Sequence, residues 1–379
     1  MYKILPVSHS KTYYCFFAFA FTWNNIGIGV PIDYHGDLRF RTERVKQPEA
    51  TDDRTTEGKI FWRSMLRARL QLDLNINEKI QTTLRFASGN DQITTANVEI
   101  GDGFQNKTFG IEQAYLQFKP LSKLEIAVGK VASPMYRPGG SEMVWDKDLS
   151  PEGIYGLCRS DFDKLRIKSL IASFTFAENQ TNDDREIGVA AVQTEYMFSE
   201  EFQFILGVSQ FLFSKTKGSE LIEDTGGNTY ESIAFGDEPA NVYLNNYTVL
   251  EMFSEAIYIL EGRRLSFYYH SIENVEASKN NRGLAYGLGY GLAKAKGSWS
   301  AKVHMRQTES DTTVSLFDDN NFNLGQTGGK GFIASGSYAF YDDFLATLSH
   351  FNFRRNNANN AYQSANRGSV TQIDLTTLF

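Results

Sequence analysis

Apolar and polar residues alternate along much of the chain, in stretches of about ten residues that each end at a turn. Residues 61–75 are the clearest example. One face of this stretch carries Leu66, Ala68, Leu70, Leu72 and Leu74, and the opposite face carries Arg63, Arg67, Arg69, Gln71 and Asp73. Because successive side chains of a β-strand point to opposite sides, this period predicts strands with one apolar and one polar face.

The same period predicts about sixteen strands between residue 34 and the end of the chain. They are 35–46, 61–75, 79–90, 109–119, 122–131, 152–160, 164–177, 186–198, 201–215, 247–260, 263–274, 283–296, 298–309, 330–341, 343–355 and 368–379. Their connections alternate between short turns and long polar loops. The long ones are 47–60, 91–108, 132–151, 178–185, 216–246, 275–282, 310–329 and 356–367. This alternation is typical of an all-β transmembrane antiparallel barrel with short periplasmic turns and long extracellular loops.

Aromatic residues cluster at the short-turn ends of the predicted strands, on the apolar face. They are Phe118, Phe198, Phe202, Tyr258, Trp299, Phe340, Phe344 and Phe379. Such a set predicts an aromatic girdle at one membrane interface. The alternative is a soluble β-rich binding protein, a sandwich or closed barrel with an apolar interior and a charged surface. The girdle favours the membrane barrel.

Composition excludes several classes of protein. The chain has 379 residues, with 38 Lys and Arg against 45 Asp and Glu, a net charge of −7. This balance leaves no basic footprint for nucleic acid. No run of about eighteen apolar residues exists, which excludes a helical membrane protein. The two cysteines, Cys15 and Cys158, provide no disulfide framework.

The sequence predicts two parts of the chain, a signal peptide and leader over residues 1–33 and the barrel over residues 34–379. Lys3 and Lys11 precede a short aromatic-rich apolar run that ends in the cleavage pattern Ala18-x-Ala20. An ordinary N-terminal strand is the alternative for this segment.

We predict that the stretch Val131–Gly153 forms a functional loop between two strands. Pro134, Pro138 and Pro151 punctuate it, and it carries more charged and aromatic residues than a connector requires. Long loops inside a compact chain are usually functional, and a solvated surface excursion is the alternative.

Several motifs resemble the putative-porin family of Gram-negative outer membranes. They are Arg67-Ala68-Arg69-Leu70, Phe86-Ala87-Ser88-Gly89-Asn90, Gln113-Ala114-Tyr115-Leu116, Gly129-Lys130, Tyr136-Arg137 and Val144-Trp145-Asp146-x-Asp148-Leu149-x-Pro151-Glu152-Gly153. The resemblance implies a barrel of about sixteen strands in the outer membrane, in contact with its lipids. It also implies a channel for passive diffusion of small hydrophilic solutes and ions, and a homotrimer. The last strand, ending in Phe379, resembles the signal by which outer-membrane assembly machinery recognises barrels.

In porins generally the third long loop folds inward and narrows the lumen, so the resemblance implies that 131–153 is the constriction loop. The expected pore-lining and constriction residues are Arg39, Arg41, Arg63, Arg67, Arg69, Arg85, Tyr136, Arg137, Glu142, Trp145, Asp146, Lys147, Asp148 and Glu152. Acidic loop residues opposite basic wall residues would create a transverse field. Alternatively, the arginines and nearby carboxylates simply neutralise one another in a polar lumen.

An outer-membrane barrel enzyme of lipase or protease type is the remaining alternative, and the motifs argue against it. Neither HExxH nor G-x-S-x-G occurs, and the five His show no zinc-ligand spacing. We predict no enzymatic activity, no cofactor and no metal site. The acidic pairs 183–184 and 318–319 could bind calcium, although solvated loops are the expected state.

Overall fold

A computed structural model describes residues 29–48, 59–89, 93–177, 184–221, 227–235, 238–355 and 367–379. The strands are β1 (Ile32–Lys46), β2 (Ile60–Asn77), β3 (Ile80–Ser88), β4 (Val98–Glu99), β5 (Phe109–Leu121), β6 (Leu124–Lys130), β7 (Glu152–Phe162), β8 (Leu165–Ala177), β9 (Arg185–Met197), β10 (Phe202–Phe213), β11 (Tyr230–Phe235), β12 (Glu238–Tyr243), β13 (Tyr247–Leu260), β14 (Arg263–Asn274), β15 (Arg282–Gly291), β16 (Trp299–Thr308), β17 (Gly329–Tyr341), β18 (Phe344–Arg355) and β19 (Arg367–Leu378). Short 3-10 turns are η2 (Pro138–Gly140), η3 (Ser315–Phe317) and η4 (Phe322–Leu324).

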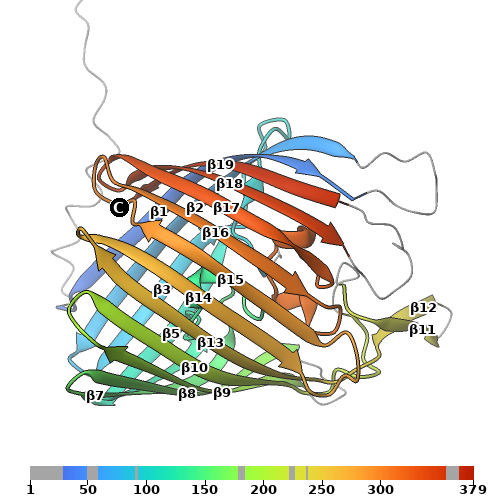
Figure 1. Ribbon diagram of the computed structural model, residues 1–379, viewed down its shortest axis with the longest axis horizontal. Helices are drawn as coiled ribbons and strands as arrows, with labels where there is room; N and C mark the ends of the chain where they lie inside the picture. The colour runs from blue at the N-terminus through green and yellow to red at the C-terminus, as the bar shows by residue number, and fades with distance from the viewer. Residues whose placement is uncertain are drawn as a thin grey trace, which may run out of the picture.

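The long strands form one closed antiparallel barrel (Figure 1). Consecutive long strands pair with each other, and β1 closes the ring by pairing with β19 across Arg41 and Asp374. The sheet has 17 strands because the two-residue β4 adds to sixteen long ones. The predicted sixteen-strand antiparallel barrel is therefore confirmed. Within the described ranges, no helix is long and apolar enough to cross a bilayer.

The alternating apolar and polar residues of the strands lie on the outer and inner faces of the barrel wall, respectively. Leu70 and Leu206 are 37% and 49% exposed on the outer face, whereas Arg67 and Asp73 are 9% and 8% exposed on the inner face. The girdle aromatics lie on the outside beside short turns, with Phe198 and Phe379 more than half exposed. An apolar outer band flanked by aromatics is the surface that a bilayer requires.

The structure differs from the sequence predictions at three places. The hairpin β11–β12 projects at one end of the barrel from a connection predicted as loop (Figure 1). β15 ends at Gly291 rather than at residue 296, because Gly291 adopts φ 75° and its backbone lies against that of Trp299. The barrel begins at Ile32, inside the predicted leader. Residues 1–28 of the predicted signal peptide and leader, which include Cys15, lie outside the described residues, as does Asp183.

Two long connections lie inside the barrel and form a second layer. We name residues 131–151 loop L3 and residues 309–328 loop L7. One region of the inner wall between β7 and β14 is apolar, with buried Phe174, Ile187, Phe211 and Val249. The loops cover this wall with apolar side chains that join the same buried cluster. In this region the strands are apolar on both faces, because the loops cover the inner one.

Candidate functional site

L3 begins at the end of β6 and is fastened to the opposite side of the barrel. Its two ends are joined by a hydrogen bond from the Val131 amide to the Pro151 carbonyl, 2.8 Å long. Tyr136 donates its hydroxyl to Glu255 of β13 at 2.7 Å and stacks on Phe253 with ring centroids 5.3 Å apart. L3 therefore extends across the lumen face of several strands.

The tip of L3 is η2, which docks on β13–β16. The Gly139 amide donates to Glu255 at 2.9 Å, and its carbonyl accepts from Lys302 at 3.1 Å. The Ser141 hydroxyl lies 2.9 Å from His270 Nδ1. Gly139 has φ 57°, and a Cβ there would lie 2.0 Å from the Tyr268 ring. Only glycine allows this approach.

We expect Gly139→Ala to displace the tip of L3, because alanine adds both left-handed backbone strain and a clash with Tyr268. Limited proteolysis of the folded barrel should then cut L3 faster than in the natural chain. Gly218→Ala is the matched control, since Gly218 has φ 75° but no atom within 4 Å of the added Cβ. Equal cleavage of both variants would mean that the tip does not depend on this contact.

The returning limb of L3 combines an apolar anchor with charged contacts. Trp145 is 3% exposed and stacks on Phe317 of L7, with centroids 5.7 Å apart and planes 5° apart. Asp148 accepts from Arg69 at 2.9 Å and lies 3.8 Å from Arg67. Lys147 pairs with Glu142 at 3.2 Å within the loop. Trp145 thus anchors L3, while Asp148 reaches the basic wall.

The six wall arginines lie on three neighbouring strands, β1, β2 and β3. Five of them have carboxylate partners in ion pairs: Arg41 with Asp374 at 2.6 Å, Arg63 with Glu43 at 2.6 Å, Arg67 with Asp37 at 2.7 Å, and Arg69 and Arg85 both with Glu112 at 2.6 Å. Arg39 donates to the Asn97 amide oxygen at 2.7 Å and has no carboxylate within 4 Å among the described residues. The wall arginines are thus paired mainly with carboxylates of the wall itself, and L3 reaches them through Asp148.

Two expected site residues lie away from this wall. Glu152 pairs with Lys130 at 2.6 Å and shares the face of the outward Ile154, because it is already part of β7, where side chains alternate. The expectation that Glu152 faces the arginines is therefore wrong. Arg137 precedes the tip, where its carbonyl accepts from the Gly140 amide at 3.0 Å.

L7 also enters the lumen, although the sequence predicted an ordinary solvated loop there. Asp318 and Asp319 are 2% and 6% exposed, and both pair with Arg306 of β16. No surface is exposed at three further residues of L7, Thr312, Thr313 and Phe322. The sequence signals were two short apolar runs inside an otherwise polar loop, Val-Ser-Leu-Phe at 314–317 and Phe-Asn-Leu at 322–324.

Comparisons with known proteins agree with this geometry. A family model described as "Putative porin" matches residues 18–235 and 239–379. The chain belongs to the putative-porin family. A search of curated proteins gives no match.

Solved porins share the fold of this porin at low sequence identity. OprB of Pseudomonas putida aligns with TM-score 0.57 and 10% identity over 92% of this chain and 94% of that chain. OmpF of Salmonella typhi gives TM-score 0.53 and 13% identity over 93% and 98%. A loop-deleted OmpT of Vibrio cholerae gives 0.52 and 11% over 92% and 99%. The protein is thus an outer-membrane porin of a Gram-negative bacterium, a barrel that forms a channel.

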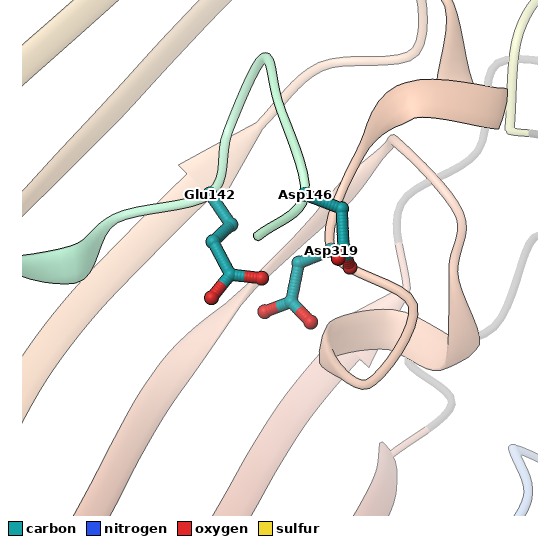
Figure 2. A group of neighbouring side chains, drawn as sticks. All are labelled: Glu142, Asp146 and Asp319. Atoms are coloured by element: carbon teal, nitrogen blue, oxygen red, sulfur yellow. The ribbon is translucent and has the colours of Figure 1, made fainter. Parts of the chain in front are cut away.

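Three carboxylates of the porin meet where L3 and L7 touch (Figure 2). Glu142 and Asp146 come from L3 and Asp319 comes from L7, and one oxygen of each lies within 4.8 Å of the others. This spacing lets the carboxylates share a cation or a proton. Burial, and then the charge of Glu142, raises the pKa of Asp146 to about 8. Burial also raises the pKa of Glu142.

We expect the contact between L3 and L7 to weaken as pH rises. Asp146 faces Glu142, Asp148, Lys147 and Asp319, and its ordinary pKa of 3.8 is raised to about 8 in the loop. Its contribution to the packed state is therefore complete below about pH 4 and is lost progressively until the pH passes about 8. Amide hydrogen exchange of L3, corrected for the intrinsic rate, should show less protection at pH 8.5 than at pH 5.

Asp146→Asn should reduce this dependence, because it removes one of the two L3 carboxyls whose pKa burial raises. Protection that stays constant with pH in the natural chain, or an unchanged slope in Asp146→Asn, would contradict the prediction.

Proposed function

We propose that L3 and the arginines of β1–β3 together form the charge-selective part of the porin channel. The observation that carries the proposal is the contact of Asp148 with Arg69 at 2.9 Å and Arg67 at 3.8 Å. These side chains are about nine-tenths covered, so water screens their charges less than on an open surface. A solute passing this contact would meet both signs of charge at short range, which favours hydrophilic over apolar solutes.

The proposal predicts opposite selectivity changes from opposite substitutions. Asp146→Asn with Asp148→Asn should move selectivity toward anions, mainly through Asp148, because Asp148 contacts Arg67 and Arg69 whereas the raised pKa of Asp146 keeps that carboxyl mostly protonated near neutral pH. Arg67→Gln with Arg69→Gln should move it toward cations. Each change should alter the permeability ratio on the order of severalfold, because the charges act in a narrow, partly desolvated passage. Reversal potentials across a salt gradient measure it.

Arg282→Gln is the control for this experiment, because Arg282 is paired with Glu273 at 3.1 Å but its side chain is 74% exposed. It should leave the reversal potential near that of the natural chain. Unchanged potentials in both double variants would remove L3 and the arginines from the selective part of the channel.

We further propose that the porin acts without enzymatic chemistry and that it assembles as a homotrimer. Membership of the porin family supports both. Single-channel conductance in a planar bilayer, together with no turnover of phospholipid or peptide substrates, tests the first, and cross-linking of the purified protein tests the second. We also propose that the channel conducts ions, which the same single-channel conductance measurement tests.

The two ends of the sequence support two proposals about biogenesis. We propose that the part of the predicted leader 1–33 that precedes β1 at Ile32 directs export as a signal peptide, and that assembly machinery recognises the last strand. Phe379 exchanges backbone hydrogen bonds with Gly36 at 2.8 and 3.1 Å, next to the seam of the barrel. Phe379→Ala should slow assembly, measured as the appearance of heat-modifiable barrel, if the terminal aromatic is recognised.

A further inference from the structure

L7 is packed against L3 along a continuous contact. The Asp146 amide donates to the Phe317 carbonyl at 2.8 Å, and the Asp319 amide donates to the Glu142 carbonyl at 3.2 Å. The Asn320 amide donates to the Asp146 carboxylate at 3.2 Å. Neither loop can therefore move far in the lumen without breaking hydrogen bonds to the other.

The opposite side of L7 is held by the barrel wall. Arg306 of β16 is 4% exposed and pairs with Asp318 and, at 3.5 Å, with Asp319. Asn321 accepts from Gln372 of β19 at 2.7 Å and from Arg41 of β1 at 3.5 Å. The segment Asp318–Asn321 thus runs from L3 to the seam formed by β19 and β1.

The same segment also lines the smaller of two neighbouring cavities. One cavity, of about 900 Å³, is lined by Trp145, Asp148 and Phe317, and the other, of about 590 Å³, is lined by Arg41, Asn320 and Asn321. Leu316 lines both. The side-chain amide of Asn320 donates to the Thr94 carbonyl at 2.7 Å, so the segment also contacts the second long connection.

We propose that the segment Asp318–Asn321 of L7 is a second constriction element of the channel. L3 narrows the lumen from the side of β7–β14, and this segment narrows it from the side of β16–β19 and β1. Solutes that enter the smaller cavity meet the amides of Asn320 and Asn321 and the guanidinium of Arg41. The proposal rests on the proposed function, because it concerns selection within the same passage.

The chemistry of this segment indicates which solutes it favours. Arg306 pairs with both Asp318 and Asp319, and the smaller cavity is lined by charged side chains of both signs, among them Arg63 and Glu99, as well as by Asn320 and Asn321. Amides hydrogen-bond polar neutral groups without favouring either sign of charge. We expect the second constriction to limit the size of polar solutes, while the contact between Asp148 and the arginines selects charge.

A thiol-blocking experiment tests the position of the segment. In a Cys158→Ser background, Asn321→Cys is treated with a bulky methanethiosulfonate reagent during single-channel recording. We expect conductance to fall by about half or more, because the added group occupies the narrow passage. Gly218→Cys is the matched control, since Gly218 lies on an exposed loop with no atom within 4 Å of an added Cβ. No fall in a channel with fully modified Asn321→Cys would overturn the proposal.

A second variant releases the segment instead of blocking it. Arg306→Gln removes both ion pairs to L7, and conductance should rise about twofold as the cross-section widens. Arg282→Gln, which removes an exposed arginine, should leave conductance unchanged. A natural chain that forms no channel at all would contradict the proposed function. A conducting natural chain with an unchanged Arg306→Gln variant would contradict only the second constriction.

Discussion

Leu70→Arg should impair insertion of the barrel. An arginine on the lipid-facing side at the membrane midplane makes the free energy of folding into the bilayer less favourable by about 2–4 kcal/mol. Leu70 lies near the centre of β2 and is 37% exposed on the outer face. A guanidinium there loses its water on entering lipid and has no carboxylate partner on that face. Urea titration of folding into lipid vesicles measures the free energy.

Gln71→Arg is the matched control, because it places the same side chain one residue further along the same strand. Gln71 faces the lumen and donates to Asp73 at 2.8 Å, so an arginine there meets water and carboxylates. Its effect should stay within about 1 kcal/mol, as for a surface substitution. If Gln71→Arg were the more damaging change, the lipid and lumen faces of β2 would have to be exchanged.

Trp145→Ala should make the packed state of L3 and L7 less stable by about 3–5 kcal/mol, the range for truncating a large buried aromatic side chain. The indole lies among Phe174, Phe211 and Phe317, with centroids 5.7 to 6.3 Å away. Its loss leaves a cavity at the point where L3, L7 and the wall meet. Amide hydrogen exchange should show that L3 and L7 open more often, and channel recordings should show a larger and noisier conductance.

Trp62→Ala removes the same side chain from the outer face of β2, where Trp62 is 65% exposed. No cavity forms inside the barrel, so exchange of L3 should match that of the natural chain. Protection of L3 that is equally reduced in both variants would show that the effect comes from losing a tryptophan in general. Unchanged protection in Trp145→Ala would mean that L3 is held without its aromatic anchor.

The barrel wall could be predicted from the sequence because its determinants are local. In a strand the side-chain period is two, so the alternation around Leu70 fixes which face meets lipid. Turn residues mark each strand end, and all sixteen long strands lie within a few residues of their predicted bounds, apart from the end of β15 at Gly291. That exception arises from a left-handed backbone that any glycine can adopt, and glycine alone does not reveal where it will do so.

The arginines and the acidic residues of L3 could be named from the sequence, but their pairings could not. Arg69 lies opposite Asp37 and Ala87 on the neighbouring strands, yet its partners are Glu112 on β5 and Asp148 on L3. Alternation and family resemblance located both groups. Whether they face each other across water or touch depends on where L3 returns to the wall.

The sequence by itself determined the antiparallel barrel, its lipid and lumen faces, and the candidate constriction loop. Only the tertiary structure decided that L7 enters the lumen, that Trp145 is an anchor, and that Glu142, Asp146 and Asp319 meet. The physical reason is that strand pairing follows a short repeating pattern, whereas loop burial depends on a few contacts between distant segments. Asp319 joins Glu142 only because Arg306 and Phe317 hold L7 inside the barrel.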